Sequence, residues 1–184
     1  MVKKIFIGIF ILIAVMVGCL ILTVLLVASA SKPKGDREEI LKSTEKKPKK
    51  ALIVYQPAVS DITYKMAQKI AKGLNDGGYE VILNCPGEHL PNNTSGFSVV
   101  VFGSPSYGGK PLTVLTDYMS RINDFSSSRI VLFSTGANPK TTEIDLMESF
   151  LKDRKPVKKI KFPVGEGKEN ENTAYKLGVE LSKE

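Results

Sequence analysis

The sequence has few of the side chains that metal sites and hydrolase sites require. Its 184 residues include one histidine, His89, and two widely separated cysteines, Cys19 and Cys85. A typical zinc site takes four ligands, mostly Cys and His, so no metal ligand is assigned. In GSPSYG the spacing from Gly103 to Ser106 is one residue too long for a nucleophile elbow, and His89 precedes the serine instead of following it. No residue is therefore given a catalytic role.

An excess of positive charge is absent from most of the chain. Residues 1–50 hold ten Lys/Arg and four Asp/Glu, whereas residues 51–184 hold sixteen Lys/Arg and fifteen Asp/Glu. The formal net charge of +7 therefore comes almost entirely from the first 50 residues. Nucleic-acid binding calls for Lys/Arg clustered on one face of a domain. The near-neutral balance of residues 51–184 argues against a nucleic-acid partner.

Charge of either sign is absent from residues 5–27, IFIGIFILIAVMVGCLILTVLLV. These 23 residues are long and apolar enough to cross a bilayer as a helix and to contact membrane lipid, with residues 1–4 as a short flank. The run exceeds the roughly 7–15 apolar residues of a secretory signal. Residues 28–30, ASA, nevertheless have the form of a cleavage site, so a cleaved signal stays open as the alternative.

Basic residues are unequally divided between the two ends of this predicted transmembrane helix. Two Lys/Arg precede it, and eight lie within residues 31–50. The positive-inside rule then predicts that the remainder of the chain faces the cytoplasm. Residues 28–50 are interpreted as a basic tether, which is either mostly disordered because its hydrophobicity is low or attracted to anionic lipid. Its four acidic residues weaken the attraction to lipid, so a disordered tether with weak lipid attraction is favoured.

Residues 51–184 form the predicted domain, in which short apolar runs alternate with helical patterns. Continuous apolar runs are typical of strands buried on both faces, and strand–helix alternation implies right-handed crossovers and a parallel sheet. We predict an α/β fold, a doubly wound five-stranded parallel sheet preceded by a single transmembrane helix. The predicted strands are 51–55, 79–83, 98–103, 129–133 and an edge strand 157–162, and the predicted helices are 62–74, 111–122, 142–151 and 172–181.

Doubly wound folds bind ligands at the carboxyl ends of their strands. The loops at the ends of the first, third and fourth predicted strands are residues 56–63, 104–110 and 134–139, called here the first, second and third loops. The second loop offers the aromatic ring of Tyr107, followed by two glycines that allow conformations closed to other residues. The third loop combines hydroxyl groups with glycine.

With these loops, residues 51–184 resemble the flavodoxin-like domains, which bind flavin mononucleotide (FMN). The stretches VVVFGSPSYGG, IVLFSTGANP and TAYKLGVEL carry the resemblance, and GSPSYGG is the most specific of them. The resemblance implies that the first loop wraps the FMN phosphate and that the second and third loops border the isoalloxazine ring. The residues implied to bind the cofactor are Gln56, Ser60, Asp61, Ile62, Thr63, Ser104, Pro105, Ser106, Tyr107, Gly108, Gly109, Ser134, Thr135, Gly136 and Ala137.

The same resemblance implies particular roles around the ring. Tyr107 would stack on it, and a carbonyl of Gly108 or Gly109 would accept the hydrogen of flavin N5 in reduced states. Backbone N–H groups of residues 135–137 would bind the pyrimidine edge. The cofactor itself would supply the electron chemistry.

The first loop departs from the family pattern, in which Thr-Gly-Asn-Thr opens the helix. Residues 60–63, SDIT, align with those four, so Ser60 and Thr63 keep the hydroxyl groups. Asp61 replaces the glycine and brings a carboxylate near a phosphate dianion, and Pro57 removes a backbone donor. Asp61 could cap its own helix and compete with the phosphate, whereas a capping Ser60 would turn Asp61 outward. Both arrangements stay open.

Two functions of different classes fit these observations. The first is a membrane-tethered flavodoxin-like protein that binds FMN and transfers electrons, as a carrier or an oxidoreductase, to or from a membrane-linked partner. That partner would be an unknown redox protein or a quinone-type acceptor. The second is a flavin-free, flavodoxin-shaped interaction module in which Asp61 caps its own helix.

Overall fold

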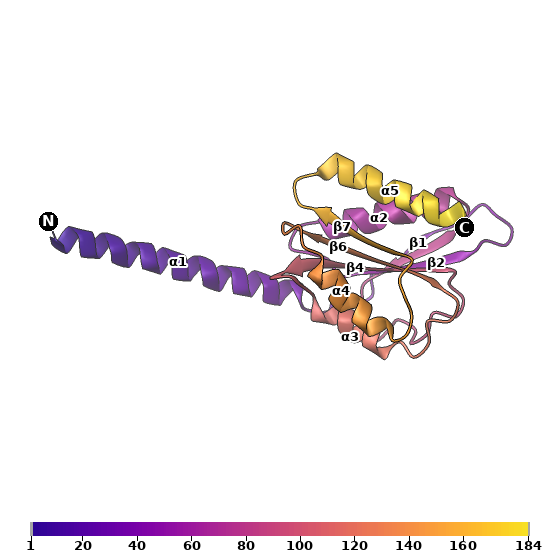
Figure 1. The fold of residues 1–184 in the computed structure, drawn as a ribbon, viewed down its shortest axis with the longest axis horizontal. Helices are drawn as coiled ribbons and strands as arrows, with labels where there is room; N and C mark the ends of the chain where they lie inside the picture. Colours follow the sequence, from indigo (N-terminus) through magenta and orange to yellow (C-terminus); the bar gives the residue numbers. More distant parts are fainter. Residues whose placement is uncertain (1, 184) are drawn as a thin grey trace. The chain divides into compact units, whose positions relative to one another are not determined.

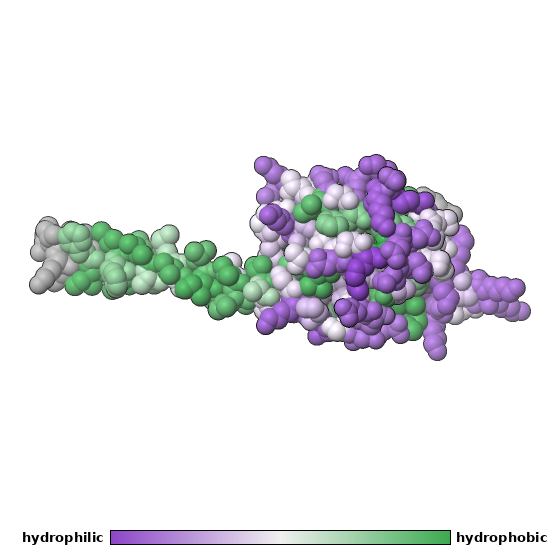
Figure 2. Space-filling model, turned by 90° about the horizontal axis from the view of Figure 1, so that it is seen from below, coloured by the Kyte–Doolittle hydropathy of each residue, from purple (hydrophilic) through white to green (hydrophobic). Residues whose placement is uncertain are grey.

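The N-terminal unit of the computed structural model is a single apolar helix, α1 (Val2–Ala30), and the structure as a whole describes residues 2–183. Within α1, Phe6–Ala30 is long and apolar enough to cross a membrane, a property that a signal sequence near the N-terminus would share. Figure 2 shows apolar side chains along this helix and a largely hydrophilic surface on the folded unit. A second compact unit begins at Pro33, before the predicted domain boundary at residue 51.

The second unit is a seven-stranded sheet with helices on both faces (Figure 1). The strand order is β1-β3-β2-β4-β6-β7, with β5 paired to β4, and α2 and α5 cover one face while α3 and α4 cover the other. The strands are β1 (Glu39–Leu41), β2 (Lys50–Tyr55), β3 (Glu80–Asn84), β4 (Val99–Tyr107), β5 (Lys110–Pro111), β6 (Arg129–Gly136) and β7 (Lys158–Pro163). The helices are α2 (Ile62–Asp76), α3 (Thr113–Arg121), α4 (Thr142–Glu148) with the 3-10 turn η1 (Ser149–Leu151), and α5 (Gly167–Lys183).

The predicted number of five strands was wrong, because the sheet has seven. The five predicted strands are β2, β3, β4, β6 and β7, which pair in parallel. The additional strands, β1 and β5, pair antiparallel with β3 and β4. They have three and two residues, too few to show the apolar run or alternation from which a strand is recognised.

Strand β1 lies inside the segment that we predicted to be a mostly disordered tether. The backbone N–H of Arg37 donates to Oδ1 of the buried Asn84 at 2.8 Å. Nδ2 of Asn75 donates to the carbonyl of Leu41 at 3.3 Å. Both amide side chains come from the folded core elements, so the order of residues 33–50 depends on contacts that local composition does not reveal.

The strands β4 and β6 continue farther than predicted, to Tyr107 and Gly136, so the second and third loops begin as paired sheet. Gly108 and Gly109 then form a two-residue turn between β4 and β5, with φ of 59° and 75°. Two successive positive φ values are characteristic of the type I′ hairpin, which explains the glycine pair. The hairpin places Pro111 in β5 instead of at the start of α3.

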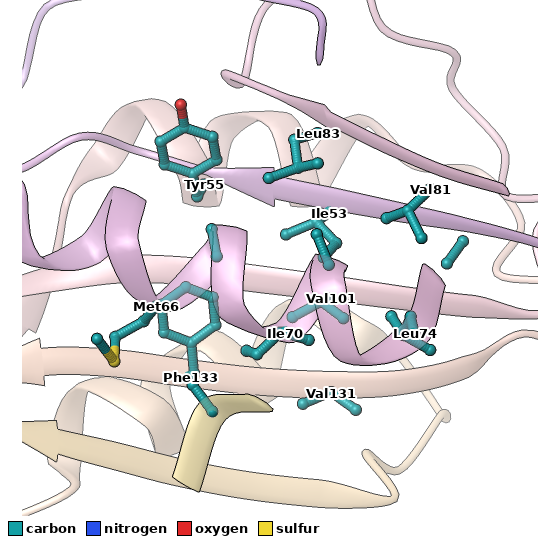
Figure 3. Close-up of a cluster of buried hydrophobic side chains, with 14 of the residues drawn as sticks. Ile53, Tyr55, Met66, Ile70, Leu74, Val81, Leu83, Val101, Val131 and Phe133 are labelled. Carbon is teal, nitrogen blue, oxygen red and sulfur yellow. The ribbon is translucent and has the colours of Figure 1, made fainter. Parts of the chain in front are cut away.

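Two apolar clusters fill the spaces between the sheet and its helices. Figure 3 shows the cluster under α2, in which Met66 lies near Phe133 and Leu74 lies near Val131 of the sheet. The cluster residues of α2 and β2 match the helical periodicity and the continuous apolar run of these elements. The sequence pattern therefore identified this part of the core.

Helices α2 and α5 pack most closely at Gly73 and Gly178. A Cβ on Gly178 would lie 2.2 Å from the carbonyl oxygen of Ile70, and one on Gly73 would lie 2.3 Å from the carbonyl oxygen of Tyr175. Backbone atoms cannot rotate away, so Gly178→Ala must separate the helices. We expect a loss of about 1–3 kcal/mol in the free energy of unfolding, measured by urea denaturation in detergent.

The matched control for this prediction is Gly167→Ala at the start of α5. A Cβ there would have no atom within 4 Å, so the free energy of unfolding should stay within about 0.5 kcal/mol of the unmodified protein. Equal stability of the Gly178 and Gly167 variants would contradict the close packing.

Candidate functional site

The strands β2, β4 and β6 end at one edge of the sheet, where a doubly wound fold binds its ligand. A cleft of about 270 Å³ lies there, called here the three-loop cleft. Eight of its ten lining residues belong to the set implied by the flavodoxin resemblance. The lining residues are Ala58, Ser60, Ile62, Pro105, Ser106, Tyr107, Thr135, Gly136, Ala137 and Val164.

Ala58 and Val164 were not predicted as site residues. Ala58 belongs to the first loop, and Val164 follows directly after β7. The carboxyl end of β7 reaches the same edge because all five long strands run in parallel. The predicted edge strand was therefore a signal for Val164 that the sequence interpretation did not use.

Tyr107 extends from β4 to the first loop and forms a hydrogen bond with it. Its hydroxyl oxygen accepts the backbone N–H of Val59 at 3.0 Å. The hairpin that carries Tyr107 is held to α4, because Thr142 Oγ1 donates to the carbonyl of Gly109 at 3.2 Å. The predicted stacking residue thus occupies a backbone donor of the predicted phosphate loop. Of the two carbonyls proposed for flavin N5, that of Gly109 already accepts the bond from Thr142.

The hydroxyl group of Thr63, a predicted phosphate contact, is buried and bonded inside the domain. Its Oγ1 lies 2.7 Å from Oγ1 of Thr135, and both side chains are buried. A buried hydroxyl needs such a partner, and this pair links the first turn of α2 to β6. Ser60 is exposed and lines the three-loop cleft, so it is the first-loop hydroxyl available to a ligand.

Asp61 points to solvent and does not cap its own helix. Its Oδ2 lies 2.9 Å from Nζ of Lys65, one turn along α2, and no side-chain hydrogen bond caps the N-terminus of the helix. The hydrogen bond from Lys65 lowers the pKa of Asp61. The negative charge of the carboxylate is therefore partly balanced by Lys65. The Asp61 side chain forms no hydrogen bond with the N–H groups of the first helical turn.

Three predicted site residues besides Thr63 are buried and do not line the cleft. Gln56 is fully buried. Ser104 Oγ accepts the backbone N–H of Leu112 at 2.9 Å, and Ser134 Oγ donates to Oε1 of Glu143 at 2.6 Å. Ser104 and Ser134 therefore fix the backbone on which the second and third loops are mounted.

A buried ion pair, which the sequence interpretation missed, lies under the third loop. Glu143 Oε1 accepts hydrogen bonds from Lys161 Nζ and Ser134 Oγ, each at 2.6 Å. Lys161 Nζ also donates to the carbonyl of Lys140 at 2.6 Å, which ties the third loop to β7. Burial by itself would raise the pKa of Glu143, but the two hydrogen bonds outweigh it and hold that pKa below its ordinary value.

Of the three backbone N–H groups predicted to bind the pyrimidine edge, only that of Ala137 lies outside the sheet. Thr135 and Gly136 lie within β6, which pairs with β4 and β7 on its two sides. Ala137 is the first residue beyond the strand and is exposed at the cleft. A Cβ on Gly136 would lie 3.1 Å from Cβ of Ser106, so the cleft wall is tightly packed at this point.

Comparison with known proteins supports the fold through structure and not through sequence. No protein-family model matches the chain, and no curated protein matches it. Flavodoxin 2 from Bacillus cereus is similar with a TM-score of 0.61 and 18% identity, over 73% of this chain and 98% of that one. A flavodoxin from the domain Archaea is similar with a TM-score of 0.57 and 16% identity, over 73% of this chain and 96% of that one.

A longer oxidoreductase shows the same likeness over part of its length. Rubredoxin oxygen:oxidoreductase from Desulfovibrio gigas gives a TM-score of 0.59 and 16% identity, over 74% of this chain and 36% of that one. The chain thus spans about a third of that protein. At these identities the likeness establishes a flavodoxin-like fold.

Proposed function

We propose that the folded unit binds FMN in the three-loop cleft and that the chain transfers electrons to or from a partner at a membrane. The observation that carries the proposal is that the three loops converge on one cleft. Eight residues that the resemblance implies, from three loops far apart in the sequence, line one cleft at the ligand-binding edge of the sheet. Bound FMN would supply one- and two-electron redox chemistry.

The residues of the cleft fit the ring end of the cofactor. Pro105, Gly136 and Ala137 give the cleft a lining of small or apolar residues, and the aromatic ring of Tyr107 lines it as well. The volume of about 270 Å³ lies slightly below the roughly 300–1,000 Å³ of most ligand pockets. Release of Tyr107 from Val59 would widen the cleft and free one backbone donor of the first loop.

The flavin-free interaction module is the second candidate, and the bond between Tyr107 and Val59 favours it. In that case the bond closes the cleft permanently and the fold serves as a scaffold. Self-capping by Asp61, the earlier basis for this candidate, has no support because its carboxylate pairs with Lys65 instead.

Attachment to a membrane is the second part of the proposal. It rests on the apolar helix α1 and on the excess of Lys/Arg after it, which favours a folded unit facing the cytoplasm. Strand β1 begins at Glu39, soon after α1 in the chain, and its first residue pairs with Leu83 near the carboxyl end of β3. Within the folded unit, β1 therefore begins at the sheet edge that carries the candidate site. A redox protein or a quinone-type acceptor at the membrane would be the partner.

Flavin uptake tests the proposal directly. We expect the full chain in neutral detergent to quench the fluorescence of added FMN and to shift its visible absorption, with one flavin bound per chain at saturation. Bovine serum albumin in the same detergent controls for nonspecific uptake. Protein that leaves both signals of FMN unchanged would remove the first candidate and leave the interaction module.

A further inference from the structure

A second cleft, of about 380 Å³, lies on the other side of the first loop and is called here the Arg37 cleft. It is larger than the three-loop cleft and shares Ala58 and Ser60 with it, so the first loop is a common wall. A ligand whose ring occupies the three-loop cleft meets the Arg37 cleft where it passes Ser60. The remaining lining residues are Arg37, Glu39, Tyr55, Pro57, Val59, Asp61 and Tyr64.

The backbone of Arg37 is held at this position by a buried side chain. Asn84 Oδ1 accepts the backbone N–H of Arg37, and Asn84 Nδ2 donates to Oδ1 of Asp36, both at 2.8 Å. Asn84 is 2% exposed and ends β3. The segment that leads into β1 is therefore fixed beside the first loop, and Arg37 is presented from a defined backbone position.

The other charged groups of the Arg37 cleft are already paired. Asp61 lies 2.9 Å from Lys65, and Oε1 of Glu39 accepts the hydroxyl proton of Tyr64 at 2.7 Å. Within residues 2–183, the guanidinium group of Arg37 forms no hydrogen bond or ion pair. Arg37 is thus the positive group of this cleft that stays available to an anion.

We propose that Arg37 binds the phosphate monoester of FMN and so supplies the positive charge that the first loop lacks. A guanidinium group forms paired hydrogen bonds with phosphate oxygens. Ser60 and the N-terminal turn of α2 lie at the same wall, where helix N–H groups add to the attraction. This inference rests on the proposed FMN binding and assigns its phosphate end to a segment outside the predicted domain.

The test compares FMN with riboflavin, which lacks the phosphate, on the full chain in neutral detergent. We expect Arg37→Gln to weaken FMN binding by roughly tenfold or more, since hydrogen bonds between charged groups are the strong ones. Riboflavin binding should not change, which also shows that the variant is folded. The FMN affinity of Arg37→Lys should lie between those of the unmodified protein and Arg37→Gln, because lysine keeps the charge without the paired donors.

Lys42→Gln is the matched control. It removes the same charge from the same N-terminal segment, but Lys42 does not line the Arg37 cleft. It should leave FMN binding unchanged. Equal FMN affinity of Arg37→Gln and the unmodified protein, or equal FMN and riboflavin affinity of the unmodified protein, would overturn the assignment while flavin binding itself stands. Absence of binding to either flavin would remove the proposed function and this inference together.

The phosphate group of a membrane lipid could bind the Arg37 guanidinium group in the same way. Phosphatidylglycerol added to the detergent should leave FMN affinity unchanged if Arg37 serves the cofactor. Competition by this lipid that disappears in Arg37→Gln would assign the guanidinium group to lipid and overturn the inference.

Discussion

Replacing Lys161 by methionine is expected to lower the free energy of unfolding of the folded unit by about 3–5 kcal/mol, the range observed when one partner of a buried ion pair is removed. The Lys161 side chain is 6% exposed and that of Glu143 is 0% exposed. Within residues 2–183, Glu143 Oε2 has no hydrogen-bond partner. Loss of the ammonium group would therefore leave a buried carboxylate that only Ser134 stabilises.

Thermal unfolding followed by near-ultraviolet circular dichroism measures this effect, and a drop of about 10 °C is expected for a unit of this size. Lys159→Met is the matched control on the same strand. Lys159 pairs with Asp145 and Glu148 at the surface, where an ion pair contributes about 1 kcal/mol or less. Similar losses from both lysine variants would contradict the importance of burial.

The acid dependence of stability should follow from the same ion pair. The pKa of Glu143 is lower in the folded state than the roughly 4.3 of an unfolded glutamate. Its contribution is therefore complete above about pH 4.3 and is lost as pH falls through the folded-state pKa. Glu143→Gln should remove this part of the acid dependence, and an unchanged pH profile would show that other carboxyl groups control it.

Tyr107 variants should change FMN binding in opposite directions. Tyr107→Ala removes the aromatic face, and stacking of a base on an aromatic side chain is worth about 1–3 kcal/mol. We expect FMN to bind roughly tenfold or more weakly. Tyr107→Phe keeps the ring but frees the N–H of Val59, a hydrogen bond worth about 0.5–1.5 kcal/mol. Its FMN affinity should rise by about two- to tenfold.

Fluorescence titration and stopped-flow mixing measure the two effects, and Tyr118→Phe is the control. Tyr118 is a buried tyrosine of α3 whose hydroxyl group donates to the carbonyl of Pro91, and it does not line the cleft. It should not alter flavin binding. Unchanged affinity of Tyr107→Ala would remove this residue from the site, and weaker binding of Tyr107→Phe would mean that the hydroxyl group contacts the cofactor itself.

Much of the fold was predictable because its signals are local. The apolar runs that became β2 and β4 and the periodic positions Met66, Ile70 and Leu74 of α2 are recognisable within a few residues. Parallel strands bring their carboxyl ends to one edge. The sequence could therefore indicate that the three loops converge, and the structure brings eight of the fifteen implied residues into the cleft.

The chemistry inside the cleft was not predictable in the same way. The sequence left two arrangements of Asp61 open, and the structure shows the outward one, in which Asp61 pairs with Lys65 one turn away. Thr63 became a core residue because Thr135, 72 positions along the chain, bonds to its hydroxyl group. No local pattern distinguishes a hydroxyl that binds a ligand from one that binds another buried hydroxyl.

The sequence by itself determined the apolar N-terminal helix, the five parallel strands, the order of these elements along the chain, and the sheet edge at which the three loops meet, because hydrophobic periodicity acts over neighbouring residues. Only the tertiary structure decided that Tyr107 bonds to the first loop, that Glu143 pairs with Lys161, and that Arg37 adjoins the same loop. Each of these depends on contacts between segments far apart in the chain. Such contacts form only when the packed sheet fixes both partners.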